Sequence, residues 1–452
     1  MFFLDETIEL NESKIIDIIQ EFNTIERPKI QRRKNYFLGK QDILQKTASN
    51  QFKPNNRIVS NFCSMIANTY SGYLTGKQIT YTSEKDITAI QDILNYNDIG
   101  AEDTDFLMNA LIAGIAYEIC WIDADGKQRF KTLESENCIP VYSSSLDEEL
   151  RAVIRYYKID NIGTNNDKYY VDVYQQDKVV RYKSDQGFSS LEFIEELPNY
   201  YNQVPIVVFP LNKNRTSIFD DIMDLQNAYN TLISSSVDDW EAFADCYLLI
   251  SGMTLGDEEE AHKVIKEMRE NRIMVLDEGG EVKYLNKDIK MDQIENLLVR
   301  INKKIHTISA CPDFSDEAFG TSSGIALQYK LLGFENTAGR IEKSMKKALQ
   351  KRIELICSIL SLTNGENIWR DIKFTFHRNL PADIGNIADT VNKLRGIVSD
   401  STLLEQIPFV KDVDKELELL NAQKEQDKLT SPFYQDVLNY QTLAQMNNNE
   451  TE

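Results

Sequence analysis

The amino-acid sequence predicts an α+β protein that combines long amphipathic helices with a mostly antiparallel sheet. Two observations carry this prediction. Apolar residues recur every three or four positions through three long stretches in the second half of the chain. Between residues 117 and 210 the pattern changes to short runs rich in Val, Ile and Tyr, which is typical of strands. The chain has 452 residues, enough to bury a substantial core and to divide into several domains.

The first hundred residues are predicted to form helices broken by loops. Apolar residues at helical spacing mark one helix before Pro28 and a second that two glycines close. The first stripe is Ile15, Ile18, Ile19 and Phe22, and the second is Ile58, Phe62, Met65, Ile66 and Tyr70, followed by Gly72 and Gly76. A third helix is expected over residues 107–116.

The strand-rich region is predicted to begin with a hairpin. Residues 117–123 and 128–133 flank a four-residue turn in which Gly126 stands where a positive φ is wanted. Further strands are expected over residues 151–159, 169–174, 179–182 and 205–209.

Two long helices with an insertion between them follow. The helix over 217–246 has an apolar stripe with one gap, at Ser236, and an acidic opposite face without any Lys or Arg. Its acidic residues are Asp220, Asp221, Asp224, Asp238, Asp239, Glu241 and Asp245. The insertion, 247–290, is predicted to hold a helix over 257–270 and a hairpin that pairs 272–276 with 281–285. The second helix, 291–310, ends at Pro312, which cannot continue the backbone hydrogen bonding.

A loop rich in Gly, Ser and Asp then leads into the longest periodic stretch, residues 323–360. Its apolar residues step by three or four without a miss: Leu327, Leu331, Phe334, Ala338, Ile341, Met345, Leu349, Ile353, Ile356 and Leu360. Gly333 and Gly339 weaken this helix locally, so a bend is expected there. A strand over 372–376, helices between 384 and 420 and a polar tail complete the chain.

Composition limits the possible functions. The net charge is −21, whereas a protein that grips nucleic acid needs a basic surface, so any contact with DNA is expected to be local, weak or transient. The six cysteines are scattered, which favours reduced thiols. We expect a soluble protein made in a cytoplasm, because the N-terminus lacks signal-peptide features and no apolar run could span a bilayer.

No convincing catalytic or cofactor site emerges. GxxxxGK[ST] and GxGxxG are absent, and three dispersed histidines offer no zinc spacing. Residues 320–324 match G-x-S-x-G around Ser322, but a polar loop precedes them where a hydrolase needs a strand. Cys311 follows His306 by five residues without a third orienting group, so a small buried hydrophobe is the favoured interpretation. We therefore expect no enzyme, no metal and no cofactor.

Basic residues gather on the third long helix: Arg340, Lys343, Lys346, Lys347, Lys351 and Arg352. A solvated face is the favoured interpretation, and contact with an acidic neighbouring subunit or with DNA is the alternative.

Several segments, in order along residues 30 to 380, resemble the portal proteins of siphophages from Gram-positive hosts. They are residues 36–44 (YFLGKQDIL), 54–59 (PNNRIV), 72–77 (GYLTGK), the strand at 205–209 leading into 217–229, and 323–331 (SGIALQYKL). The resemblance implies a portal fold that forms a ring, dodecameric in the family, at one capsid vertex, with double-stranded DNA passing through a central tunnel. It divides the chain into a wing (1–216), stem helices (217–246 and 291–310), a clip (247–290), a tunnel loop (311–323), a long wing helix and strand (324–379), and a crown with a C-terminal tail (380–452).

The same resemblance implies roles for individual residues. The tunnel loop comprises Pro312, Asp313, Phe314, Ser315, Asp316, Glu317, Phe319, Gly320 and Ser322. Acidic residues are expected to line the tunnel or the outer stem so that DNA slides: Asp220, Asp221, Asp224, Asp313, Asp316 and Glu317. Arg300, Lys303 and Lys304 are expected to form sparse basic rings that steady the duplex.

The expected partners are further copies of the chain, viral DNA in transit, the terminase, the major capsid and scaffolding proteins, and a head-tail adaptor at the clip, without a membrane. The terminase would supply the ATPase that this chain lacks. The expected location is the capsid vertex of the virion, after assembly in the host cytoplasm. Two alternatives remain: another head-tail adaptor or scaffold protein, although adaptors are usually much smaller, and, remotely, a serine or cysteine hydrolase acting through Ser322 or Cys311.

Overall fold

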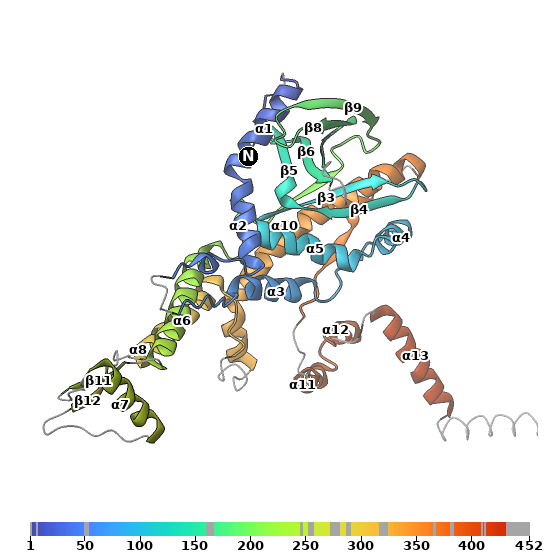
Figure 1. The fold of residues 1–452 in the computed structure, drawn as a ribbon. Coiled ribbons are helices and arrows are strands. Elements are labelled where there is room, and N and C mark those ends of the chain that lie inside the picture. Colours follow the sequence, from blue (N-terminus) through green and yellow to red (C-terminus); the bar gives the residue numbers. More distant parts are fainter. Residues whose placement is uncertain are drawn as a thin grey trace, which may run out of the picture. The chain divides into compact units, whose positions relative to one another are not determined.

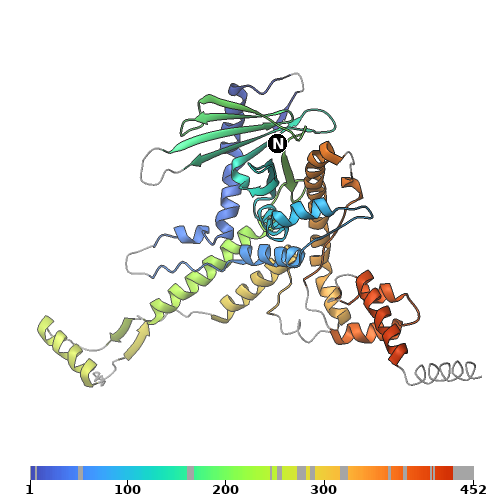
Figure 2. The ribbon, with the colours of Figure 1, turned by 90° about the vertical axis from the view of Figure 1, so that its right-hand side faces the viewer.

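The computed structural model describes most of the chain (Figures 1 and 2). The described residues are 2–5, 8–48, 54–159, 167–244, 247–251, 257–271, 281–285, 291–315, 324–364, 368–379, 384–407, 410 and 413–430. The chain forms two compact units, Met1–Asn379 and Leu380–Glu452. Both helices and sheets are present, as the α+β prediction requires.

The N-terminal part of the first unit is helical, with boundaries that partly differ from the prediction. Helix α1 (Glu12–Ile25) buries Ile15, Ile19 and Phe22, and α2 (Arg27–Phe37) carries Pro28 in its first turn, where a missing N–H costs nothing. Helix α3 spans Phe62–Thr75, so Ile58 precedes it in extended backbone and was wrongly placed in a helix. Helices α4 (Thr88–Tyr96) and α5 (Ile99–Ala113) follow.

The expected third helix also needs a correction at both ends. It begins at Ile99 and stops at Ala113, because Gly114 takes a φ of +82° and the chain continues as a strand. A Cβ at position 114 would meet the backbone of Arg215 and Thr216, so this close approach requires glycine.

A six-stranded sheet has the order β1-β5-β6-β7-β8-β9. Its strands are β1 (Phe2–Leu4), β5 (Cys138–Ser143), β6 (Leu150–Ile159), β7 (Lys168–Gln175), β8 (Lys178–Ser184) and β9 (Leu191–Pro198). All neighbours are antiparallel except β1 and β5, which confirms a mostly antiparallel sheet. Helix α1 covers one face of it and shares one core cluster with it (Figure 2).

A second sheet has the order β10-β3-β4, with strands Ile206–Pro210, Ile115–Ile122 and Gln128–Leu133. The β3–β4 hairpin is confirmed, and Gly126 in its turn has a φ of +76°. The predicted strand near 372–376 is observed as β13 (Lys373–Thr375), which pairs with β2 (Thr80–Thr82).

The expected long helices are present. A 3₁₀ turn, η3 (Asp220–Ile222), leads into α6 (Met223–Ala244), and α8 (Met291–Ser309) lies beside α6 (Figures 1 and 2). Between them come β11 (Tyr247–Ser251), α7 (Glu258–Asn271) and β12 (Glu281–Leu285), and β12 pairs with β11. The predicted partner of β12, residues 272–276, lies outside the described residues.

Helix α10 spans Gly324–Asn364 and is the longest helix in the described chain. Its predicted stripe is buried from Leu331 to Ile356, with Leu360 packed against the same core. The continuous stripe explains the length, because each turn buries apolar area against α3, α4 and β10.

The second unit contains α11 (Ile384–Leu394), α12 (Asp400–Glu405) and α13 (Val413–Thr430), and α12 packs on α13. In the part of the chain described here, no helix combines the length and apolar character that crossing a membrane requires.

Candidate functional site

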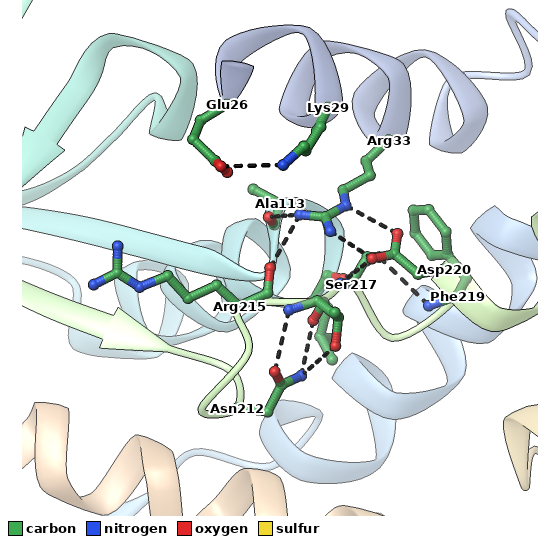
Figure 3. A network of polar contacts seen from close by, with 11 residues as sticks. Glu26, Lys29, Arg33, Ala113, Asn212, Arg215, Ser217, Phe219 and Asp220 are labelled. Atoms are coloured by element: carbon green, nitrogen blue, oxygen red, sulfur yellow. Dashed lines mark hydrogen bonds and ion pairs between the residues drawn. The ribbon is translucent and has the colours of Figure 1, made fainter. Parts of the chain in front are cut away.

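The N-terminal end of α6 is attached to α2 by Arg33 (Figure 3). Arg33 donates from Nε to Asp220 Oδ1 at 2.9 Å and from Nη2 to Oδ2 at 2.5 Å, a bidentate pair that is largely buried. Its Nη1 donates to the carbonyl oxygens of Ala113 (2.7 Å) and Arg215 (3.1 Å). Asp220 was expected on an exposed acidic face. Arg33 of the same chain instead pairs with its carboxylate, and this ion pair attaches the start of α6 to α2.

Residues 56–62, which we call the strap, run antiparallel along α6 in non-helical backbone up to Phe62, where α3 begins. Side chains four residues apart on α6 accept hydrogen bonds from every second backbone N–H of the strap. The N–H of Phe62 donates to Gln226 Oε1 (2.9 Å), that of Ser60 to Asn230 Oδ1 (2.9 Å), that of Ile58 to Ser234 Oγ (2.9 Å) and that of Asn56 to Asp238 Oδ1 (2.6 Å). Gln226, Asn230 and Ser234 are fully buried, so these bonds satisfy polar groups that burial would otherwise penalise.

The outer end of the strap, at Asn56, is attached to α6 by Asp238. Its carboxylate accepts from the Asn56 backbone, from Asn56 Nδ2 (2.9 Å) and from Lys46 Nζ (2.5 Å). Partial desolvation would raise the pKa of Asp238, but the bonds from Lys46 and Asn56 outweigh it and hold the pKa below its ordinary value. The sequence placed Asp238 on an unpaired acidic face, because its partners lie about 190 residues earlier in the chain.

The end of α8 is tied to the core and to the start of the expected tunnel loop. The Ser309 carbonyl accepts from Tyr70 Oη at 2.9 Å, and His306 Nδ1 lies 3.0 Å from the Cys311 carbonyl oxygen. Asp313 Oδ1 accepts from the backbone and hydroxyl of Ser315. Partial burial opposes ionisation of Asp313, but these bonds and the nearby His306 keep its pKa below the usual range.

The structure describes only the first part of this loop. Pro312 and Asp313 are half-buried, whereas Phe314 and Ser315 are exposed. Asp316, Glu317, Phe319, Gly320 and Ser322, which were also assigned to the tunnel loop, lie outside the described residues.

The cysteine nucleophile suggested by the sequence does not fit its surroundings. Cys311 is buried, and burial raises the pKa of its thiol to about 11, whereas a nucleophilic cysteine needs a lowered pKa. Ser322 lies outside the described residues, so the structure does not test the serine alternative. Within the described part of the chain, no three His, Cys, Asp or Glu side chains gather into a metal site.

Charged side chains are exposed on both α6 and α8, and α8 exposes Asp292 and Glu295 in its first half and basic residues further on. Asp221 and Asp224 are exposed on and just before α6, and Arg300, Lys303 and Lys304 are exposed on α8. Neither group forms an ion pair among the described residues.

Apolar side chains are also exposed on these elements. Leu297, Val299 and Ile308 of α8 and Tyr329 and Leu332 near the start of α10 are each more than 40% exposed, and Tyr329 reaches 75%. Leu297 and Ile308 belong to the apolar stripe of α8, which also includes Ile294, Ile301 and Ile305, so part of that stripe is uncovered in one chain. Such exposed apolar side chains mark protein-protein contact surfaces.

One member of the basic cluster on α10 is not on the surface. Arg352 is fully buried and binds Glu118 of β3 through two bonds (2.7 and 2.5 Å) and Asp103 of α5 (2.5 Å). Burial raises the pKa of both carboxyl groups, and Arg352 opposes that rise. The solvated-face interpretation is therefore wrong for Arg352, although Arg340, Lys343 and Lys347 are exposed.

The two glycines of the expected bend lie inside a continuous helix. A Cβ on Gly339 would have open space around it, and one on Gly333 would lie 3.6 Å from the Cβ of Ala310. Neither position excludes a side chain, so the bend remains a prediction.

Comparisons with known proteins agree over most of the chain. The family model described as "Phage portal protein, SPP1 Gp6-like" matches residues 16–429. The portal protein of Clostridium phage phiCD119 is 24% identical over 426 residues, which cover 88% of this chain and 93% of that protein. The portal protein of Bacillus phage SPP1 is 24% identical over 433 residues, which cover 89% and 82% respectively. A solved structure, "Neck of empty GTA particle computed with C6 symmetry", has a TM-score of 0.44 and 11% identity, and the match covers 75% of this chain and 86% of that one.

Proposed function

We propose that this chain, which belongs to the SPP1 Gp6-like family of phage portal proteins, forms the ring at one capsid vertex through which viral DNA is packaged and ejected. The observation that carries the proposal is the match over residues 16–429, together with two portal relatives aligned over more than four fifths of both chains. Such coverage extends across the helices, sheets and insertion described above. A smaller adaptor protein would not account for it.

The described elements support a division of labour along the chain. We assign the wing to 1–216 and 324–379, the stem to 217–246 and 291–310, the clip to 247–290, the tunnel loop to 311–323, and the crown with the tail to 380–452. The support is that α6 and α8 flank an inserted strand pair and helix, as a stem and clip require.

The charges suggest how such a ring would handle DNA. We assign Asp221 and Asp224 to an acidic tunnel or outer stem, and Arg300, Lys303 and Lys304 to sparse basic rings that steady the duplex. Asp220 is removed from this group because Arg33 binds it. An acidic lining repels phosphates, so DNA can move without being held.

Further partners follow from a portal role. The terminase would bind the ring during packaging, the capsid and scaffolding proteins would surround it, and a head-tail adaptor would bind the clip. The ring would form in the host cytoplasm, act without enzymatic activity or a cofactor of its own, and remain in the virion.

The test is the mass and the image of the purified full-length chain. We expect a closed ring, dodecameric as in the family. Replacing Leu297 and Val299 by lysine should release folded single chains, because both apolar side chains need a neighbour to cover them. Gln293→Lys, on the same helix at an already polar exposed position, is the matched control and should leave the ring intact. A wild-type chain that stays monomeric under all assembly conditions would contradict the proposal.

A further inference from the structure

The strap pairs with α6 in a pattern that secondary structure alone does not produce. In an extended segment, every second N–H points to the same side, at a spacing of roughly 6.6 Å. On a helix, residues four apart are spaced by roughly 6 Å along the axis. These two repeats nearly coincide, which is why four successive contacts form without a break.

Because the two repeats nearly coincide, the strap fixes the rotation of α6 about its axis as well as holding the helix in place. The accepting side chains lie on an i, i+4 row, and such a row is inclined by roughly 26° to the helix axis. Rotating α6 by one residue would turn Gln226, Asn230 and Ser234 away from the strap. Because all three are fully buried, each would then lose its partner without gaining water.

The inner end of the strap, at Asn61 and Phe62, is held by residues outside α6 as well as by α6 itself. Asn61 caps α3 by accepting from the Ser64 N–H at 3.2 Å, and its Nδ2 donates to the Phe37 carbonyl at 2.8 Å. Gln41 donates to Asn61 Oδ1 and accepts from Asn230 Nδ2 at 2.5 Å, so it joins the strap to α6 from the other side. The strap therefore cannot leave α6 at this end without disturbing the core.

The outer end is held outside α6 only by Lys46 among the described residues: Asn55 Nδ2 donates to the Lys46 carbonyl at 3.2 Å, and Lys46 Nζ donates to the Asn56 carbonyl at 3.5 Å. There Asp238 is half-buried and holds Asn56 with the help of Lys46. Glu241 adds one contact, accepting from Asn56 Nδ2 at 3.0 Å. The strap is thus held by the core at its Phe62 end, whereas at Asn56 it is held by Asp238, Glu241 and Lys46.

We infer that the strap is a positioning device that fixes the rotation and the axial position of α6, and that it detaches from α6 starting at Asp238. Gln226, Asn230, Ser234 and Asp238 are its positioning residues. This inference concerns one chain and does not depend on ring assembly. In a portal ring it would determine which residues of α6 face the tunnel, a consequence that does rest on the proposed function.

The test is residue-resolved amide hydrogen exchange of the full-length protein. The inference predicts an alternating pattern in which Asn56, Ile58, Ser60 and Phe62 exchange slowly, whereas Arg57 and Val59, whose N–H groups have no acceptor among the described residues, exchange quickly. Uniform exchange along residues 56–62 would overturn it.

Substitutions at the outer end separate positioning from general stability. Asp238→Ala should speed amide exchange at Asn56 by about tenfold, since one hydrogen bond contributes about a factor of ten in an opening equilibrium. Exchange at Ile58 should speed up by a smaller factor, and exchange at Phe62 should not change. Asp238→Asn keeps an acceptor for the Asn56 N–H and should restore most of the protection. Asp224→Ala is the control and should leave exchange along the strap unchanged, because this exposed aspartate of α6 has no hydrogen bond to the strap in the described part of the chain.

The outcomes distinguish this inference from the portal proposal. If Asp238→Ala releases Phe62 together with Asn56, or if it leaves Asn56 unchanged, ordered detachment is wrong even when rings form. If the alternating pattern and its response to Asp238 are present in a chain that never forms rings, the strap inference stands and the portal proposal fails.

Discussion

At the scale of single residues, the buried arginine of α10 holds together the core of the first unit. Arg352 joins three elements because its guanidinium binds Glu118 on β3 and Asp103 on α5, while Tyr81 Oη lies 3.1 Å from Nη1. Two carboxylates share one cation, so removing the cation would leave two uncompensated charges in the core.

We predict that Arg352→Met lowers the free energy of unfolding by about 3–5 kcal/mol, the usual result of breaking a buried ion pair from one side. The loss should be smaller at acid pH, because the raised pKa of both carboxyls lets them bind protons and become neutral in the folded state. Denaturant titration at several pH values measures both effects. Lys347→Met, at an exposed position of the same helix, is the control; an equal effect there would contradict this role for Arg352.

A second residue-scale prediction concerns pH and Asp238. Its folded pKa lies below the ordinary value of 3.8, so its contribution to stability is complete above that value and is lost as the pH falls through the folded pKa. The difference in unfolding free energy between the wild type and Asp238→Asn should therefore be constant near neutral pH and shrink below about pH 4. A difference that grows on acidification would refute the assignment of Lys46 and Asn56 as its stabilising partners.

At the scale of elements, the sequence predicts what depends on local pattern. The β3–β4 hairpin follows from Gly126, and α10 follows from an apolar stripe that continues from Leu327 to Leu360. The hydrogen-bond partners of the polar side of α6 could not be predicted from such a local pattern. Its partners on the strap are separated from it by more than 160 residues, and no periodicity links a helix face to a distant extended segment.

Arg352 was missed for a different reason, although a signal for it existed. It stands three residues after Leu349 and four before Ile356, on the apolar face of the helix. A charge on that face predicts a buried partner, and Asp103, between Ile99 and Phe106 on α5, is placed in the same way. The other five basic residues of the cluster on this helix stand off the apolar stripe, so Arg352 differs from them in position.

The glycines of α10 provide the element-scale prediction. If the helix needs no bend, Gly339→Ala should stabilise the chain by about 0.5–1 kcal/mol, because alanine favours the helix and its Cβ meets no atom. Thermal unfolding measures this directly. A substantial destabilisation, or rings that no longer close, would show instead that the expected bend at Gly339 is needed.

At the scale of the whole molecule, charge governs how a DNA conduit works. The chain carries a net charge of −21, and the exposed Asp221 and Asp224 lie just before and on α6, which we assign to the stem. A ring built from it should repel phosphates overall, and it can guide a duplex only through a few basic residues such as those of α8.

We therefore predict that the wild-type ring binds duplex DNA no more tightly than the non-specific range, roughly 10⁻⁴–10⁻⁶ M at physiological salt. Asp221→Lys combined with Asp224→Lys should tighten binding and steepen its salt dependence, because each lysine adds a phosphate contact. Fluorescence anisotropy with a labelled duplex provides the measurement. Asp105→Lys, at an exposed position on α5, should have little effect; if it tightens binding as much, net charge rather than the tunnel is responsible.

The assembled chain is proposed to surround a passage for DNA. A cryo-EM reconstruction of the purified full-length assembly would show this passage. We predict a closed ring whose central tunnel admits a DNA duplex, with α6 and α8 around it and Arg300, Lys303 and Lys304 facing the opening. A ring whose centre is filled by packed side chains, or an open assembly without a tunnel, would contradict it.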